Sequence, residues 1–175
     1  KMLYDRALSL NSDNLEVRFL LGIFYESREQ FDLAEEQYEL ALELEDPAVY
    51  NNLARLYVKD DRYAAATSLL LNGLRYANKE QQVFLYKNLG AARLQLGQVP
   101  EAKIALQYAI ALADSTHSVR AKIVKGESHC LLAKLLEAEK NVEEAREHWR
   151  KAIAYLSGRT IEQIQCLMQA RERLQ

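Results

Sequence analysis

The chain has 175 residues, 49% of them hydrophobic, a formal net charge of −2, and only six glycines and two prolines. This length can bury a core without a metal or a disulfide, and the scarcity of Gly and Pro argues against strands joined by many tight turns. The slight acidity argues against a general nucleic-acid binder, and no apolar run approaches the ~20 residues that a membrane span needs. The composition therefore predicts an all-α fold.

Start and stop signals divide most of the chain into helices. Asp13 and Asn14 can cap a first helix, and Asp46-Pro47 is an N-cap followed by a first-turn proline. Gly97 is a helix stop. The predicted helices span residues 15–28, 31–45, 47–59, 62–77, 79–96 and 99–113, and a further helix starts at the capping-box-like Asn141-x-x-Glu144.

A last helix follows Gly158 and begins near Thr160. Its apolar residues are interpreted as core, because an extra helix can cover the exposed end of a repeat stack. They are Ile161, Ile164, Leu167, Met168 and Leu174.

Small residues recur in three columns with the same offsets of 32, 36 and 43 residues. The columns are Gly22, Ala54, Gly90 and Ala133; then Ala34, Ala66, Ala102 and Ala145; then Ala41, Gly73, Ala109 and Ala152. Large residues stand at matching places between them, namely Tyr38, Leu70, Leu106 and Trp149. Small residues let two helices cross closely, and large ones fill the space between neighbouring helix pairs.

This pattern resembles the tetratricopeptide repeat family, in which each unit is a pair of antiparallel helices. The resemblance implies an α-α superhelix with repeats at 15–46, 47–82, 83–115 and 116–158, and a capping helix at 159–175. Residues 1–14, with Tyr4, Ala7, Leu8 and Leu10, match the end of a preceding repeat. The fourth repeat has nine extra residues, placed in Ser115–Glu127, which either lengthen its first helix by about two turns or form a separate loop.

Stacked helix pairs of this kind form a concave surface lined by the first helix of each pair. The side chains expected there are Asn51, Asn52, Arg55, Lys59, Phe84, Lys87 and Asn88, with Phe19 and Ile23 as an apolar subsite on the first unit. Asn52 and Asn88 each precede the leucine that starts the motif. Family members that bind extended peptides use asparagine at this place, so the resemblance implies that both grip a peptide main chain, for which a carboxamide has a donor and an acceptor.

A basic patch of Arg55, Lys59 and Lys87 surrounds these asparagines. A concave protein surface concentrates the positive electrostatic field of such charges. The sequence therefore predicts a scaffold that binds an extended, acidic segment of a protein or peptide partner. The alternative for the same charges is a set of solvated side chains, some of them paired with Glu residues of the neighbouring repeat. The alternatives for the whole chain are a regulatory or sensory segment of a larger protein, suggested by the start in mid-repeat, and a self-association module in a homo-oligomer.

No catalytic constellation is visible, and no Gly-rich phosphate loop or nucleophile elbow occurs. His117, His129 and His148 do not follow a metal-ligand spacing, so neither a metal nor a cofactor is expected. Cys130 and Cys166 are interpreted as small buried hydrophobes in a reducing compartment rather than as a bridge. The expectation is a non-enzymatic, cytoplasmic scaffold.

Overall fold

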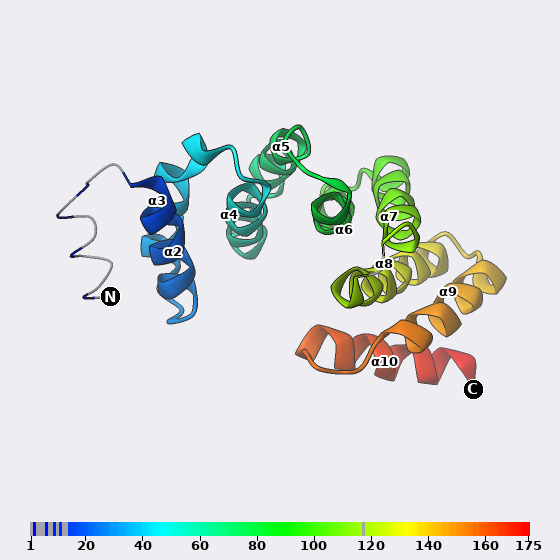
Figure 1. Ribbon diagram of the computed structural model, residues 1–175. Helices are drawn as coiled ribbons and strands as arrows, with labels where there is room; N and C mark the ends of the chain where they lie inside the picture. The colour runs from blue at the N-terminus through cyan, green and yellow to red at the C-terminus, as the bar shows by residue number, and fades with distance from the viewer. Residues whose placement is uncertain (1, 3–5, 7–8, 10, 12–13, 117) are drawn as a thin grey trace. The chain divides into compact units, whose positions relative to one another are not determined.

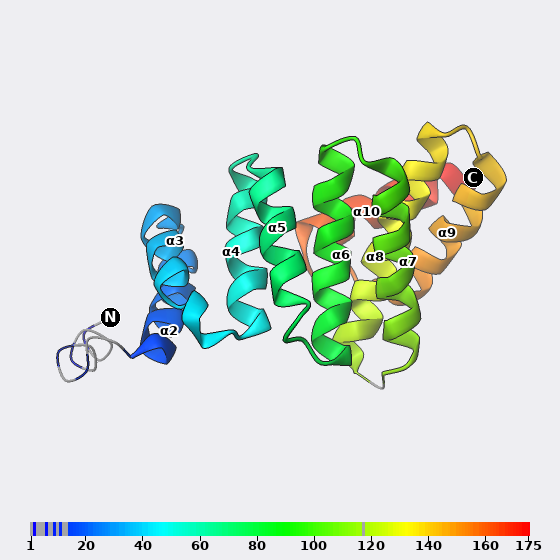
Figure 2. The same ribbon diagram turned by 90° about the horizontal axis from the view of Figure 1, so that it is seen from above.

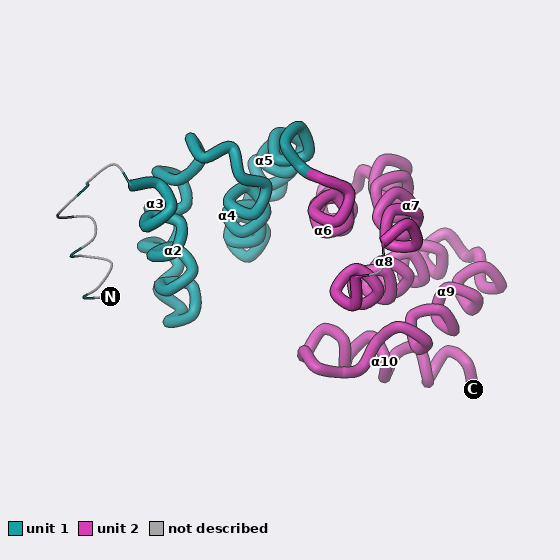
Figure 3. The backbone as a smooth tube through the Cα atoms, in the orientation of Figure 1, with its two compact units in different colours: residues 1–77 teal, residues 78–175 magenta. Residues whose placement is uncertain are grey.

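A computed structural model describes residues 2, 6, 9, 11, 14–116 and 118–175 (Figure 1). These residues form helices joined by short connections and no strand, in agreement with the all-α prediction. The chain divides into two compact units, residues 1–77 and 78–175 (Figure 3). The predicted end of a preceding repeat, with Tyr4, Ala7, Leu8 and Leu10, and the predicted cap Asp13 lie outside the described residues.

The first unit contains two helix pairs. Helix α2 packs against α3, α4 packs against α5, and α3 also packs against α4. The bounds are α2 (Leu15–Glu26), α3 (Phe31–Leu40), the short 3-10 helix η1 (Leu42–Leu44), α4 (Pro47–Lys59) and α5 (Tyr63–Gly73).

The second unit contains two further pairs and a single helix. The bounds are α6 (Lys79–Gln95), α7 (Val99–Asp114), α8 (Val119–Ala138), α9 (Val142–Tyr155) and α10 (Ile161–Leu174). Helices α6 and α7 lie side by side (Figure 2), as do α8 and α9, while α8 also packs on α6 and α7. Helix α10 packs on α8 and α9. None of the helices in the described residues is both long and apolar enough to cross a bilayer.

Most of the predicted caps form. The side chain of Asn14 accepts from the Val17 amide at 3.0 Å, and Asp46 accepts from the Ala48 amide at 2.8 Å. Asn141 differs, because its amide donates to the Glu144 carboxylate at 2.6 Å and makes no cap hydrogen bond with the backbone. The start of α9 was therefore placed correctly, but its predicted capping box is wrong.

Two helices end well before their predicted ends. Helix α3 stops at Leu40, and the chain continues through η1 to Glu45, whose φ of 55° is left-handed. Pro47 drives Asp46 out of the helical region, to a ψ of 121°, but no feature of the structure explains the earlier end of α3 at Leu40. Helix α5 stops at Gly73 instead of residue 77, since glycine is a poor helix former.

Helix α8 is one continuous helix of 20 residues. The extra residues of the fourth repeat thus lengthen its first helix, and the alternative of a separate loop is wrong over the described part of that segment. The added turns are packed, since Ala121 and Val124 join Val83 and Ala113 in a buried cluster.

The small and large columns meet as the repeat predicts. A methyl group on Gly22 would lie 2.4 Å from the ring of Tyr38, and one on Gly90 would lie 2.6 Å from Leu106. Contacts this short exclude a side chain, so these two glycines are required by close helix crossing. The four large residues Tyr38, Leu70, Leu106 and Trp149 are all buried.

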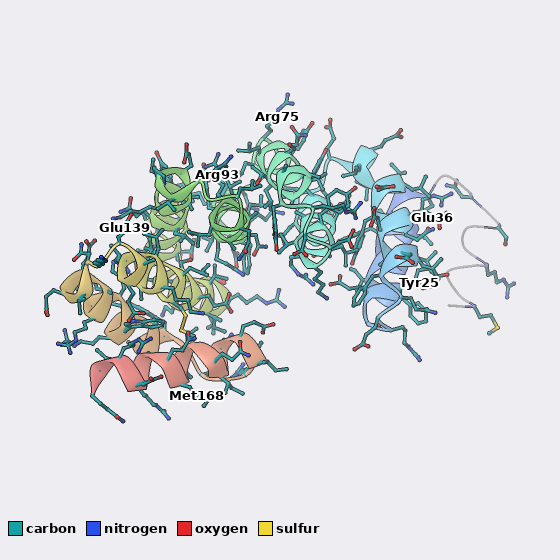
Figure 4. The ribbon with its side chains drawn as sticks, turned by 180° about the vertical axis from the view of Figure 1, so that it is seen from behind. Tyr25, Glu36, Arg75, Arg93, Glu139 and Met168 are labelled. Atoms are coloured by element: carbon teal, nitrogen blue, oxygen red, sulfur yellow. A yellow bond between two sulfur atoms is a disulfide. The ribbon has the colours of Figure 1, made fainter. Side chains whose placement is uncertain are left out.

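Helix α10 buries a face that matches the predicted one only in part. Met168 is 66% exposed, Ile161 and Ile164 are also exposed, and Figure 4 shows Met168 on α10. The buried residues are Gln163, Cys166 and Ala170. Their side chains are small or polar, so α10 can approach α8 and α9 closely. Leu167 and Leu174 are partly buried against this cluster, as predicted, whereas the predicted core residues Ile161, Ile164 and Met168 are left outside.

Candidate functional site

Two of the predicted groove residues of the first unit, Asn52 and Arg55, belong to a hydrogen-bonded network between α2, α3 and α4. The Tyr38 hydroxyl donates to Glu26 at 2.9 Å and accepts from the Asn52 amide at 3.4 Å. Arg55 donates to the Asn52 carbonyl oxygen at 3.3 Å and forms an ion pair with Glu26. Asn52 and Arg55 therefore already have partners before any ligand binds.

Burial raises the pKa of the Tyr38 hydroxyl well above its usual range, and the adjacent Glu26 carboxylate raises it further. Burial also raises the pKa of Tyr57 to about 12, with the hydrogen bond to Glu39 as the next cause. Both hydroxyls stay protonated at neutral pH, so they act as donors to these carboxylates.

The basic patch is largely compensated inside the protein. Arg55 pairs with Glu26 of the preceding repeat, and Lys87 pairs with Glu127 of the following repeat at 3.2 Å. These two charges follow the alternative that the sequence left open, pairing with a neighbouring repeat. Lys59 is different, because its ammonium lies 4.3 Å from the centre of the Phe31 ring and no carboxylate of the described residues pairs with it.

The two apolar candidates of the first unit, Phe19 and Ile23, differ in exposure. Ile23 is 41% exposed and available on the surface of α2. Phe19 is half-buried and packs on Tyr38, with ring centroids 5.9 Å apart. Asn51 is half-buried and has its own interaction within the protein.

In the second unit, Lys87 and Asn88 lie on α6, and Asn88 has an interaction within the protein. Phe84 is half-buried and packs against the cluster around Val83 and Val124. Glu127 on α8 joins Lys87 to α10, because it also accepts from the side-chain amide of Gln163 at 3.1 Å.

A pocket of about 270 Å³ opens between α6, α8 and α10, all within the second unit. We call it the α6–α8–α10 pocket. Ala91, Leu131 and Leu156 line its apolar part, and Lys134 stands at its edge with its side chain exposed. The sequence did not predict this pocket, because its third wall depends on where α10 docks.

The fold also brings together two histidines from different helices. The Nδ1 atoms of His129 on α8 and His148 on α9 are 3.0 Å apart, and Nε2 of His129 is buried without a partner. Lys125 donates to the Tyr155 hydroxyl at 2.9 Å nearby and pairs with Asp114. No cluster of three or more candidate metal ligands occurs among the described residues.

The interpretation of the two cysteines is corrected in one respect. Cys130 on α8 and Cys166 on α10 are both buried, as predicted, but they form a disulfide with their Cα atoms 6.1 Å apart. Each cysteine lies on an apolar helix face, so neither local pattern indicates a partner 36 residues away. The pairing follows from the docking of α10 on α8.

Comparison with known proteins agrees with this architecture. The family model for the tetratricopeptide repeat matches residues 15–46. Residues 15–46 are therefore a tetratricopeptide repeat. Protein CTR9 homolog of Arabidopsis thaliana is 29% identical over 129 residues, which cover 69% of this chain and 12% of that protein. The matched part of the chain thus spans about an eighth of the length of this curated relative.

Solved structures share the fold of the array. The structure of pilF from Pseudomonas aeruginosa has a TM-score of 0.73 and 19% identity, over 98% of this chain and 76% of that chain. The structure of YrrB has a TM-score of 0.63 and 19% identity, over 97% of this chain and 91% of that chain.

Proposed function

We propose that this repeat array is a protein-interaction scaffold that holds an extended, acidic segment of a partner against the first helices of its pairs. Tetratricopeptide arrays expose these helices along stacked repeats, which offers a long surface to a peptide. The fold relative YrrB is described as a tetratricopeptide protein with an unusual peptide-binding site, which supports the same class of ligand.

The observation that carries this proposal is the state of Asn52. Its two hydrogen bonds, of 3.4 and 3.3 Å, are longer than the ~2.9 Å of a strong N–H···O bond. The side chain is only half-buried, beside an Arg55 side chain that is 44% exposed. Exchanging these long bonds for bonds to a peptide main chain costs little, so Asn52 is well placed to grip an extended ligand.

The acidic preference of the ligand rests on the lysines that lack a carboxylate partner. Arg55 and Lys87 are neutralised by Glu26 and Glu127, whereas Lys59 on the first unit and Lys134 on the second are not paired with any acid of the described residues. Such uncompensated cations attract Asp, Glu or a phosphate group in a partner.

The test is affinity capture from a lysate of the source organism with four forms of the chain: wild type, Asn52→Ala, Asn88→Ala and the double variant. The loss of one or two hydrogen bonds predicts about a five- to tenfold weaker capture by the double variant. Asn72→Ala on α5 is the matched control, since Asn72 is exposed on a second helix.

Circular dichroism melting checks that the variants stay folded. Equal capture by wild type and the folded double variant would remove the asparagines from the binding surface. Capture of nothing by wild type would contradict the scaffold function itself.

A second candidate function is a regulatory or sensory repeat segment inside a larger protein. The match to 12% of the CTR9 homolog favours it. The complete gene decides this question: an attached catalytic or signalling domain supports the candidate, and a product made of repeats alone contradicts it.

A further inference from the structure

We propose that the α6–α8–α10 pocket is an anchor site for one apolar side chain of a partner peptide, and that Lys134 holds a carboxylate next to that side chain. This inference rests on the proposed function and adds to it a specific site and a ligand pattern. Neither depends on the asparagines.

The size and lining of the pocket define the ligand. Its volume of about 270 Å³ is below the roughly 300–1,000 Å³ of sites for cofactor-sized molecules, but it admits one large side chain. Ala91, Leu131 and Leu156 offer apolar surface from α6, from α8 and from the connection before α10, and Cys130 and Cys166 complete the apolar part of the lining. An aliphatic side chain such as leucine fits this chemistry.

The charges at the edge of the pocket define what stands next to that side chain. Glu127 is already satisfied, by Lys87 at 3.2 Å and by the Gln163 amide at 3.1 Å. Lys134 is exposed, and no hydrogen bond or ion pair joins it to another described residue. Glu162 also lines the pocket and has an interaction of its own within the protein. Among the charged lining residues, Lys134 is therefore the one without a partner in the described part of the chain, and its ammonium is complementary to a carboxylate of the ligand.

The pocket is preorganised by the way α10 is held. The Cys130–Cys166 disulfide and the Gln163–Glu127 hydrogen bond tie α10 to α8, and Arg173 pairs with Glu137 of α8 at 3.1 Å. A wall that is already in place does not have to be ordered when the ligand binds, which lowers the cost of binding. Recognition of a peptide main chain does not require the wall that α10 provides. The pocket therefore selects for the side chain that enters it.

The test uses a defined probe, the fluorescein-labelled peptide Gly-Ser-Asp-Glu-Leu-Asp-Glu-Ser-Gly, and the full chain. Binding is followed by fluorescence anisotropy and by amide shifts of the isotope-labelled protein. We expect shifts at Ala91, Leu131 and Gln165, and about tenfold or weaker binding when serine replaces the leucine of the probe. A probe with lysines in place of its acidic residues should also bind more weakly.

Two variants address the pocket and its edge separately. Ala91→Phe fills the pocket and should abolish the preference for leucine over serine, while Ala111→Phe, at an exposed position of α7, should not. Lys134→Glu should weaken binding about two- to fivefold, and more at low salt. Lys122→Glu, at an exposed position of the same helix, is its control.

Lys134→Glu keeps the test decisive if Ala91→Phe does not fold, because Lys134 is on the surface. Absence of probe binding up to about 1 mM, or shifts confined to other helices, overturns the inference. The scaffold function is distinguished by partner capture: an Ala91→Phe chain that captures the partner as wild type does rejects the pocket and leaves the scaffold standing.

Discussion

His129 shows how a residue can acquire a property that its local sequence does not signal. It lies between α8 and α9 with 4% of its surface exposed, and its Nδ1 faces Nδ1 of His148 at 3.0 Å. One ring must donate and the other accept, so the contact accommodates neutral rings and disfavours two protonated ones. Burial is the largest cause that lowers the pKa of His129 to about 4, followed by the charges of His148, Lys151 and Lys125.

This depressed pKa predicts acid sensitivity. The unfolded chain binds a proton at His129 near the usual pKa of 6.5, whereas the folded protein binds it only near 4, so stability falls as pH decreases through this window. We expect wild type to lose about 2 kcal/mol of unfolding free energy between pH 7 and about pH 5, measured by urea unfolding. His129→Gln, which keeps a polar amide but does not titrate, should lose less.

His148 has a lowered pKa for the same main reason, burial, so a smaller effect of His148→Gln is expected in the same direction. Carboxylates titrate at lower pH and contribute equally to wild type and variant, so the difference between the two reports the histidine. Parallel pH profiles for wild type and His129→Gln would contradict the assignment.

At the scale of single residues, the sequence predicts the contacts of positions that recur in every repeat, but it does not predict a contact that occurs once. Gly22 and Gly90 were expected to be small because their columns recur, and the structure shows the contacts with Tyr38 and Leu106 that require it. The His129–His148 pair joins one residue from each of two helices, 19 positions apart and in no repeated column. A lone sequence carries no signal for such a pair.

Helix α10 shows the same limit at the scale of an element. Its cap and extent follow from local signals, and the Thr160 hydroxyl accepts from the backbone N–H of Gln163 at 3.2 Å. Its buried face is predicted only in part, because hydrophobicity favours Met168 whereas close packing favours Cys166 and Ala170. Which face docks depends on the shape of the surface that α8 and α9 offer, and that surface belongs to the tertiary structure.

The attachment of α10 leads to a prediction about the disulfide. A cross-link between residues 36 positions apart restricts the unfolded chain, so the variant Cys130→Ala with Cys166→Ala should lose about 2–4 kcal/mol of unfolding free energy. The loss should appear as easier tryptic cleavage after Arg159 and within α10, followed by mass spectrometry.

Dithiothreitol provides the matched comparison. It should make wild type as protease-sensitive as the double alanine variant and leave that variant unchanged. If reduced and oxidised wild type are cleaved equally fast, the apolar packing of α10 and the Arg173–Glu137 pair hold the helix without help from the cross-link.

At the scale of the whole molecule, recurrence made the fold predictable and the binding surface only partly so. Three columns with common offsets are enough to predict stacked helix pairs, because each pair must bury its faces against its neighbours. The predicted groove residues lie on the first helices, but Arg55 and Lys87 are compensated by Glu26 and Glu127. Repeat patterns place side chains on a helix, whereas ion pairs depend on the reach of individual side chains between helices.

Because each helix is stabilised mainly by the helices next to it, local stability should vary along the array. Helix α8 packs against α6, α7, α9 and α10 and buries 11 of its residues, whereas α3 buries only Ala34 and Tyr38. Amide hydrogen exchange should therefore be slowest in α8 and at least about tenfold faster in α3, because local opening of α3 disrupts fewer buried contacts. Reduction of the disulfide should speed exchange in α10 first. Uniform protection across both units would instead show that the array opens as a single cooperative body, and the local account of α8 would then be wrong.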